Sequence, residues 1–172
     1  MAVEDRNFIG IGKILIDTPV EDWNIPALHF IVSRSGDKIY EAVNLEFGLV
    51  SIGESGPDSA RDLATLTCSY VLSVINEGNG YKELRETAQK NFMADYWAEY
   101  RGIEFELAET GQDLSHDFGK RINKALQEAF NGELMKALER GASKAAKEII
   151  ALVSVRPPVV EYKEIQEERA VA

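Results

Sequence analysis

The sequence has one cysteine and two histidines, and both scarcities limit the chemistry that the chain can carry. Cys68 has no partner for an intrachain disulfide. It lies in a helical pattern with Ala64, Val71 and Ile75, so we interpret it as a packed core thiol. His29 and His116 form no H-x-x-x-H pair, and neither a C-x-x-C pair nor a G-x-S-x-G motif occurs. We interpret His29 as a structural residue of a strand and His116 as part of a helix cap. The sequence therefore predicts no catalytic residues, no metal site and no cofactor.

Long hydrophobic runs are also absent, because no window approaches the ~18 apolar residues of a membrane-spanning helix. Glu4 and Asp5 stand where a signal peptide has basic residues, and no apolar segment follows them directly. We therefore expect a soluble cytoplasmic protein without a membrane partner.

Basic residues are outnumbered, with 19 Lys and Arg against 29 Asp and Glu, which gives a net charge of −10. A protein that binds nucleic acid regardless of sequence needs Lys and Arg to neutralise phosphates, so this balance argues against that class. Apolar residues make up 45% of the 172 residues, enough for a hydrophobic core without a disulfide or metal staple.

The first half of the chain has the pattern of strands followed by one helix. Short runs rich in β-branched residues are separated by turn residues, which favours an antiparallel meander. A strand is predicted at 8–16, and the meander comprises 27–33, 38–44 and 48–54. The helix that follows has its capping and early residues at 55–58 and is ended by 77–80. Gly10, Gly12 and Lys13 superficially match half of a phosphate loop, but the glycines lie inside an apolar run, which favours a strand.

The second half has mainly helical periodicity, with two short stretches typical of strands. Apolar residues recur at three and four over 81–100, 113–130 and 133–153. Ile103, Phe105 and Leu107 alternate with acids, which predicts a half-buried strand. Residues 159–162 follow a Pro-Pro pair and predict a short edge strand, and the charged tail from Lys163 is expected to fray.

Carboxylates occur in pairs that could hold Mg²⁺ or perform acid–base chemistry. Asp58 and Asp62 lie four apart on the predicted helix, and Glu104 and Glu106 share a face of the predicted strand at 103–107. We prefer the interpretation that these are solvated surfaces. No constellation supports an enzyme, so we favour a non-catalytic role.

The negative charge is unevenly distributed along the chain. Residues 1–80 contain 5 basic and 12 acidic residues, a net of −7, whereas 118–147 contains 7 basic and 3 acidic residues, a net of +4. This basic stretch is a candidate contact face for phosphates or an acidic partner, although we prefer a solvated helix surface. Its members are Lys120, Arg121, Lys124, Lys136, Arg140, Lys144 and Lys147.

Residues 28–77 resemble the N-terminal domain of HicB-like antitoxins. Ser35-Gly36-Asp37 corresponds to the family's turn, and Ile39-Tyr40-Glu41-Ala42 to its following strand. Gly48 and Gly53 match its pair of glycines.

An acid–hydroxyl pair and an acidic helix opening complete the motif, here Glu54-Ser55 and Asp58-Ser59-Ala60. Physically, Gly53 permits the bend from strand to helix, and Ser55 or Asp58 caps that helix. The family's proline-rich segment before the first glycine is replaced here by Asn44-Leu45-Glu46-Phe47.

The resemblance implies a β-β-β-α unit similar to a reduced ribonuclease H-like fold, usually with a fourth strand. Either 103–108 or 159–162 could supply that strand. It also implies binding to a small ribonuclease toxin. Many family members carry a DNA-binding tail, whose signatures this chain lacks.

We therefore predict an α+β protein in which an antiparallel meander packs on a helix, with a helical C-terminal extension. Residues 1–80 are predicted to form the HicB-like unit, residues 81–165 the helical extension, and residues 166–172 a frayed tail. The extension is either separate from the HicB-like unit or part of one compact domain with it. The predicted function is non-catalytic binding of a small basic protein, antitoxin-like or regulatory. The alternatives are a self-assembling structural protein, which would be a homo-oligomer, and a carboxylate-dependent hydrolase or nuclease.

Overall fold

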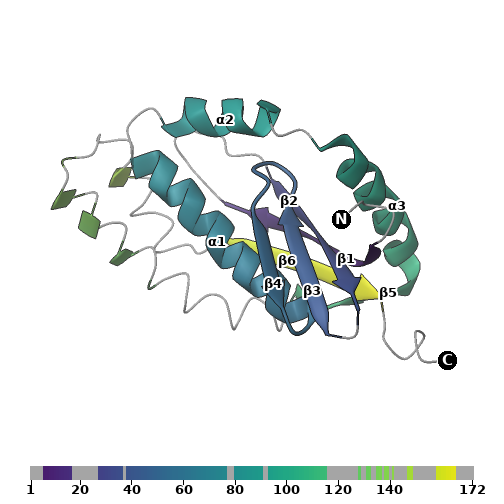
Figure 1. Cartoon of the computed structure of the whole chain (residues 1–172). Helices are drawn as coiled ribbons and strands as arrows, with labels where there is room; N and C mark the ends of the chain where they lie inside the picture. The colour runs from purple at the N-terminus through teal and green to yellow at the C-terminus, as the bar shows by residue number, and fades with distance from the viewer. Residues whose placement is uncertain are drawn as a thin grey trace.

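The structure, a computed structural model, describes residues 6–16, 27–36, 38–76, 80–90, 93–115 and 158–165, together with scattered positions between 128 and 148. Nine helices and strands have defined bounds within these residues (Figure 1). They are β1 (Asn7–Leu15), β2 (Leu28–Ser35), β3 (Ile39–Asn44), β4 (Val50–Gly53), α1 (Gly56–Asn76), α2 (Gly80–Lys90), α3 (Ala94–Thr110), β5 (Gly111–Asp113) and β6 (Val159–Ile165).

The strands form one six-stranded sheet in the order β4-β3-β2-β1-β6-β5. Every neighbouring pair is antiparallel, and β1 to β4 follow one another as a meander. The sheet then continues on the other side of β1, where β6 pairs with β1 and β5 pairs with β6. The prediction of an α+β protein with an antiparallel meander packed on a helix is therefore confirmed.

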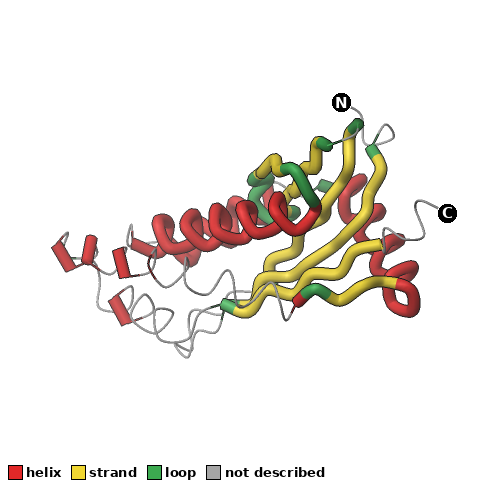
Figure 2. Tube along the Cα trace, turned by 90° about the horizontal axis from the view of Figure 1, so that it is seen from below, coloured by secondary structure: helices red, strands yellow, loops and turns green. Residues whose placement is uncertain are grey.

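Helices cover both faces of this sheet because successive residues of a strand point to opposite sides. In β2, Leu28, Phe30 and Val32 join the core beneath α1, whereas Ile31 joins the core beneath α3. Figure 2 shows α1 and α3 on opposite sides of the strands. Residues of both core clusters therefore come from the same strands.

Gly10 and Gly12 lie inside β1, as the strand interpretation predicted, and not in a phosphate-binding loop. A Cβ on Gly10 would lie 2.6 Å from the hydroxyl oxygen of Tyr162, and a Cβ on Gly12 would collide with the ring of Phe30. These glycines therefore give two large buried rings room against the sheet.

The predicted strand at 103–107 is wrong, because these residues belong to α3. Tyr100, Ile103 and Leu107 form its buried face, at spacings of three and four, while Phe105 is 85% exposed. Alternation over five residues fits a strand, but the longer helical stripe that includes Tyr100 determines the structure.

The predicted edge strand at 159–162 exists, but it is longer and lies within the sheet. β6 extends to Ile165 and lies between β1 and β5, so the residues from Lys163 to Ile165 are not frayed. Val160 and Tyr162 are buried beneath α1 and hold the strand in place. Of the two candidates for an additional strand, 159–165 is the one that joins the sheet. The helices predicted over 113–130 and 133–153 and the tail 166–172 lie largely outside the described residues.

Candidate functional site

Two glycines of the HicB-like motif occupy turns that require a left-handed backbone. Gly36, after β2, has φ of 68°, and Gly48, between β3 and β4, has φ of 73°. A residue with a Cβ atom rarely adopts such a positive φ without strain. These glycines therefore set the two turns that place β3 and β4.

Gly53, Ser55 and Asp58 join β4 to α1. A Cβ on Gly53 would lie 2.8 Å from the backbone nitrogen of Ser59, so the strand passes directly against the first turn of the helix. The backbone N–H of Asp58 donates to Oγ of Ser55 at 3.1 Å, which is the geometry of an N-cap. The Asp58 carboxylate pairs with Arg61.

The turn between β3 and β4 is fixed to β2 by hydrogen bonds to His29. Its backbone N–H donates to Oε1 of Glu46 at 2.6 Å, and its ring Nδ1 lies 2.9 Å from Oε2 of the same carboxylate. The ring also packs edge-on against Trp97, with 4.9 Å between the ring centroids. His29 has the structural role in a strand that the sequence predicted, whereas His116 lies outside the described residues.

Among the described strands, β4 lies at the edge of the sheet and pairs with β3 alone. Its outer side presents backbone N–H and C=O groups that take no part in the sheet. Such an edge is the structural requirement for strand addition by another chain.

The large side chains of β4 face away from α1. The register places Ile52 opposite Glu41 and Val50 opposite Val43, on the face that α3 covers farther along the sheet. Ser51 and Gly53 face α1 instead. Small residues are needed on that side, because the first turn of the helix approaches the strand closely.

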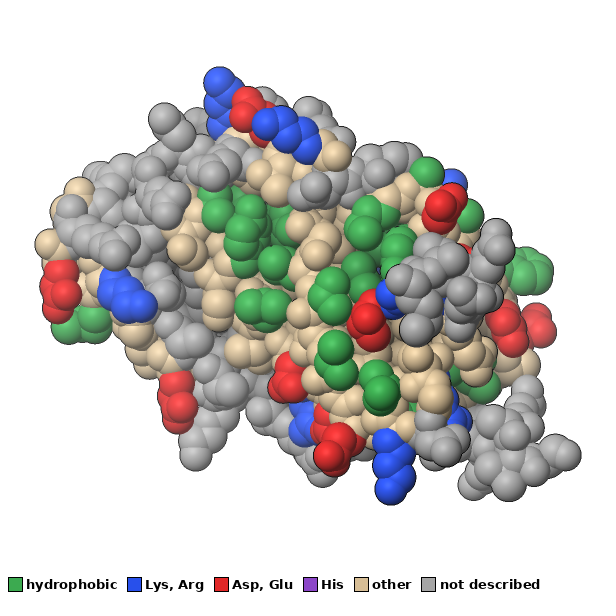
Figure 3. Space-filling view, viewed as in Figure 1, with side chains coloured by type: hydrophobic (Ala, Val, Ile, Leu, Met, Phe, Trp, Pro, Cys, Tyr) green, Lys and Arg blue, Asp and Glu red, His purple; other side chains and the backbone are tan. Residues whose placement is uncertain are grey.

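Three β-branched side chains of β3 and β4 are consequently exposed, and we call them the β4 edge patch. Ile39 is 54% exposed, Val50 is 47% exposed and Ile52 is 64% exposed. α3 packs over β1, β2, β5 and β6, which leaves this end of the sheet face open. In Figure 3, which looks toward β3 and β4, hydrophobic side chains gather on the surface over this region.

Both signs of charge flank the β4 edge patch, with Glu41 and Glu54 on the acidic side and the exposed Lys38 directly before Ile39. Glu41, which lies between Ile39 and Val43 on the same face, forms an ion pair with Arg6 that is largely buried. Glu54, directly after β4, is exposed and has no ion pair among the described residues.

The remaining candidate residues from the sequence are not gathered into a site. Glu104 and Glu106 lie on α3, so they do not share the face that a strand would give them. Of the basic stretch, only Lys136 and Lys147 are among the described residues, and five members lie outside them: Lys120, Arg121, Lys124, Arg140 and Lys144.

The described residues provide neither a cluster of metal ligands nor a membrane-spanning helix. They contain no group of three or more His, Cys, Asp or Glu side chains arranged to hold a metal ion. None of the described helices is long and apolar enough to cross a membrane.

Comparisons with models of protein families, with curated proteins and with solved structures find no match to this chain. A function for this chain is therefore inferred from its own geometry.

The β4 edge patch was not identified from the sequence, because the apolar side of a strand is usually the buried side. The available signal was the alternation Val50-Ser51-Ile52-Gly53 directly before a helix start. Where a helix begins immediately after a strand, the side with the small residues is the one that can accept the helix.

Proposed function

We propose that this chain is a non-catalytic protein-binding module of the cytoplasm, antitoxin-like or regulatory and similar to HicB-like proteins. Its partner is a small basic protein, which binds at the β4 edge patch and along the free edge of β4. The alternative of a carboxylate-dependent enzyme has less support, because the Asp58 carboxylate is already paired with Arg61.

The observation that carries this proposal is that the apolar side chains of β4 are exposed, whereas its small residues face α1. A solvent-exposed edge strand normally presents polar or charged side chains, which prevent unwanted pairing. Here Ile52 is the most exposed residue of the strand's apolar side, and Val50 and Ile39 extend the apolar surface across two strands. Backbone groups along the edge would provide affinity, and these side chains would provide specificity.

Charge favours a basic partner over a second copy of the chain. Residues 1–80, which contain β1 to β4 and α1, carry 5 basic against 12 acidic residues, a net of −7. Two copies of a chain whose net charge is −10 repel one another at long range. A basic protein would instead be attracted, and its association would slow at high salt.

The residues that carry the HicB-like resemblance flank the same strand, which supports the proposed binding edge. Gly48 sets the turn into β4, and Gly53 and Ser55 set the exit from β4 into α1. The motif therefore lies at both ends of the strand that we propose as the binding edge.

The test compares proteins retained by three forms of the full chain from an extract of its native source. The forms are the wild type, Ile52→Asp and Ser73→Asp, the last being a matched change at an exposed position of α1 far along the helix from β4. We expect a basic protein that the wild type and Ser73→Asp retain equally and that Ile52→Asp retains at least about tenfold less.

Two results would count against the proposal. Equal retention by all three forms would show that β4 is not the binding edge. If the only retained protein is the chain itself, the occupant is a second copy, and the protein is a self-assembling one.

A further inference from the structure

The backbone of β4 presents two residues to the open edge of the sheet. The carbonyl oxygen of Leu49 accepts a hydrogen bond from the backbone N–H of Asn44 at 2.8 Å, and the pairing of β4 with β3 continues from there in the same register. In an antiparallel pair, successive residues direct their N–H and C=O groups alternately toward and away from the neighbouring strand. Ser51 therefore directs its backbone groups toward β3, whereas Val50 and Ile52 direct theirs outward.

The two residues with outward backbone groups also have exposed apolar side chains. Val50 and Ile52 extend from the same face of the sheet, because they are two apart in a strand. In a strand added beside β4, the residues directly opposite Val50 and Ile52 would lie against these side chains. The same two residues thus offer hydrogen bonds and apolar contact.

Leu66 of α1 is an exposed apolar residue on the side of the helix that faces β4. Ser59 and Tyr70 lie on this side too, because seven and four residues are close to whole helical turns. The backbone of Ser59 lies against Gly53 at the end of β4, and the ring of Tyr70 packs against Phe47, which precedes β4, with 5.0 Å between the ring centroids. Leu66 lies between these two contacts and is 43% exposed.

An added strand would therefore meet apolar side chains on both of its faces. Its residues opposite Val50 and Ile52 would contact those side chains, and the residue between them would face Leu66 across the small Ser51. A strand that is covered on both faces has a continuous apolar run in place of the alternation of a half-exposed strand. The geometry thus specifies three consecutive apolar residues.

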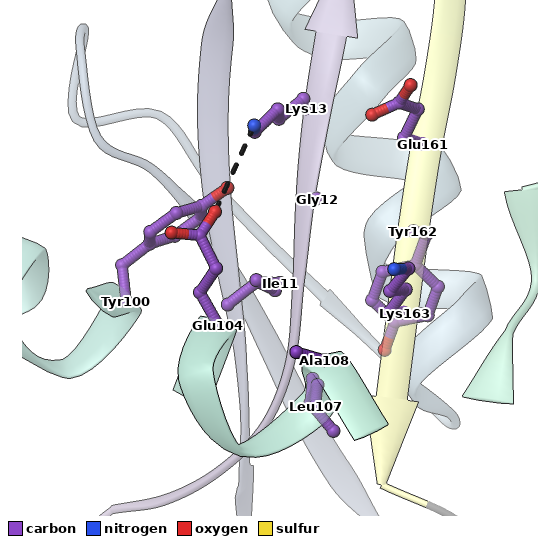
Figure 4. Close-up of a pocket in the computed structure, with 10 residues that line it drawn as sticks. All are labelled: Ile11, Gly12, Lys13, Tyr100, Glu104, Leu107, Ala108, Glu161, Tyr162 and Lys163. Carbon is purple, nitrogen blue, oxygen red and sulfur yellow. Dashed lines mark ion pairs between the residues drawn. The ribbon is translucent and has the colours of Figure 1, made fainter. Parts of the chain in front are cut away.

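Neither the other end of the described sheet nor the cavity beneath α3 offers this combination. β5, at that other end, consists of only three residues, which are small or polar (Gly111–Asp113). The cavity lies beside β1 and β6, and each of these strands already has a neighbour on both sides. Figure 4 shows Lys13 and Glu104 at this cavity, where they form a loose ion pair at 3.9 Å.

We infer that the occupant of the β4 edge is a single extended strand of the basic partner with three consecutive apolar residues, and that Leu66 is a specificity-determining residue for it. This inference rests on the proposed function and adds the backbone groups that pair and the sequence that fits. A strand from a second copy is disfavoured by the net charge of −10 that both copies would carry.

The test titrates the full-length chain with the peptide Lys-Lys-Val-Ile-Val-Lys-Lys and follows amide NMR shifts. We expect saturable binding below about 1 mM. The same peptide with N-methyl groups on its three apolar residues cannot donate hydrogen bonds to β4 and should bind at least about tenfold more weakly. Glu-Glu-Val-Ile-Val-Glu-Glu should also bind at least about tenfold more weakly, because its charge has the sign of the chain's own.

Hydrogen exchange tests the direction of the backbone groups before any peptide is added. In the free protein the N–H of Ser51 should exchange slowly, and the N–H groups of Val50 and Ile52 should exchange fast. The lysine peptide should slow exchange at Val50 and Ile52. Fast exchange at Ser51 in the free protein would contradict the inferred geometry.

Two changes to the chain separate the backbone contact from the side-chain contact. An amide-to-ester exchange at Ile52 removes its outward N–H and keeps its side chain, and it should weaken peptide binding about fivefold or more. The same exchange at Ser51 removes an inward N–H, so it should lower the melting temperature more and weaken binding less. Leu66→Gln should weaken binding about fivefold or more, whereas Phe105→Gln, an exposed position of α3 on the opposite face of the sheet, should leave it unchanged.

The inference is wrong if the lysine peptide does not saturate below about 5 mM, or if its N-methylated form binds equally well. It is also wrong if the native basic partner is lost by Ile52→Asp but fully retained both by the ester at Ile52 and by Leu66→Gln. In that last case the proposed function stands, because the partner still needs the β4 edge patch, but it does not bind as an added strand.

Discussion

The ring of Phe30 on β2 occupies the space in which a side chain on Gly12 of β1 would begin. The carbonyl oxygen of Glu161 approaches the same point from β6, at 2.5 Å from an ideal Cβ. Gly12 is thus enclosed by a buried ring and by the backbone of the next strand, and neither can move without disturbing the core beneath α1.

Gly12→Ala should therefore be strongly destabilising. We expect the free energy of unfolding to fall by about 3 kcal/mol, because the added methyl group displaces Phe30 or separates β1 from β6. Denaturant unfolding of the purified protein measures this change.

Gly102→Ala is the matched control for that measurement. Gly102 lies within α3 with no atom near its missing Cβ, and alanine is the better helix former. This variant should gain about 0.5–1 kcal/mol. Equal effects of the two substitutions would show that crowding at Gly12 is not what matters.

Ser55→Ala should remove the cap of α1. The Asp58 N–H would lose its acceptor, at a cost of about 1 kcal/mol. Ser55→Asp, which keeps an acceptor and adds a negative charge at the helix N-terminus, should restore most of that loss. A failure of Ser55→Asp to restore stability would mean that the hydroxyl has a different role.

The Cys68 thiol should make stability depend on alkaline pH. Burial raises the pKa of this thiol from 9.0 to about 12. The folded protein therefore keeps its proton where the unfolded chain releases it, so the contribution is complete below pH 9 and declines above it, by about 1.4 kcal/mol per pH unit up to the folded pKa.

Cys68→Ala isolates this effect, because tyrosines contribute in the same direction at high pH. The stability of wild type should decline more steeply than that of Cys68→Ala between about pH 9 and 10.5. The native thiol should also resist alkylation at pH 8 and react on unfolding. Rapid modification of the folded protein would contradict the buried position of Cys68.

Ile52→Thr should leave stability nearly unchanged, within about 0.5 kcal/mol, because the side chain is mostly exposed and threonine is also β-branched. Leu63→Ala, in the core beneath α1, should cost about 2–5 kcal/mol. Thermal unfolding of both variants checks the contrast. A large loss for Ile52→Thr would mean that Ile52 supports the fold and not a partner.

The sequence predicted the meander and α1 well, because each signal there is local. Turn glycines such as Gly36 and Gly48, and the cap at Ser55, act over a few residues and need no distant contact. The sequence also identified the two glycines of β1 as strand residues, although it gave no indication that Phe30 and Tyr162 fill the space above them.

The predictions from sequence are wrong where contacts with a distant element determine the secondary structure or the strand pairing of a segment. Ile103 and Leu107 fit a strand or a helix equally over five residues, and packing against the sheet selects the helix. β6 joins the sheet beside β1 although almost 150 residues separate the two strands in the sequence. The exposed side of β4 was also not predicted, although its signal is local, because the small residues of the strand face the helix that starts directly after it.

The most direct test of the proposed binding edge is photo-crosslinking in cells of the native source, with a photoreactive residue at position 52 or, as the control, at position 73. The account predicts that position 52 forms a covalent product with one small basic protein and that position 73 does not. A product that forms equally from both positions, or only with a second copy of the chain, would contradict it.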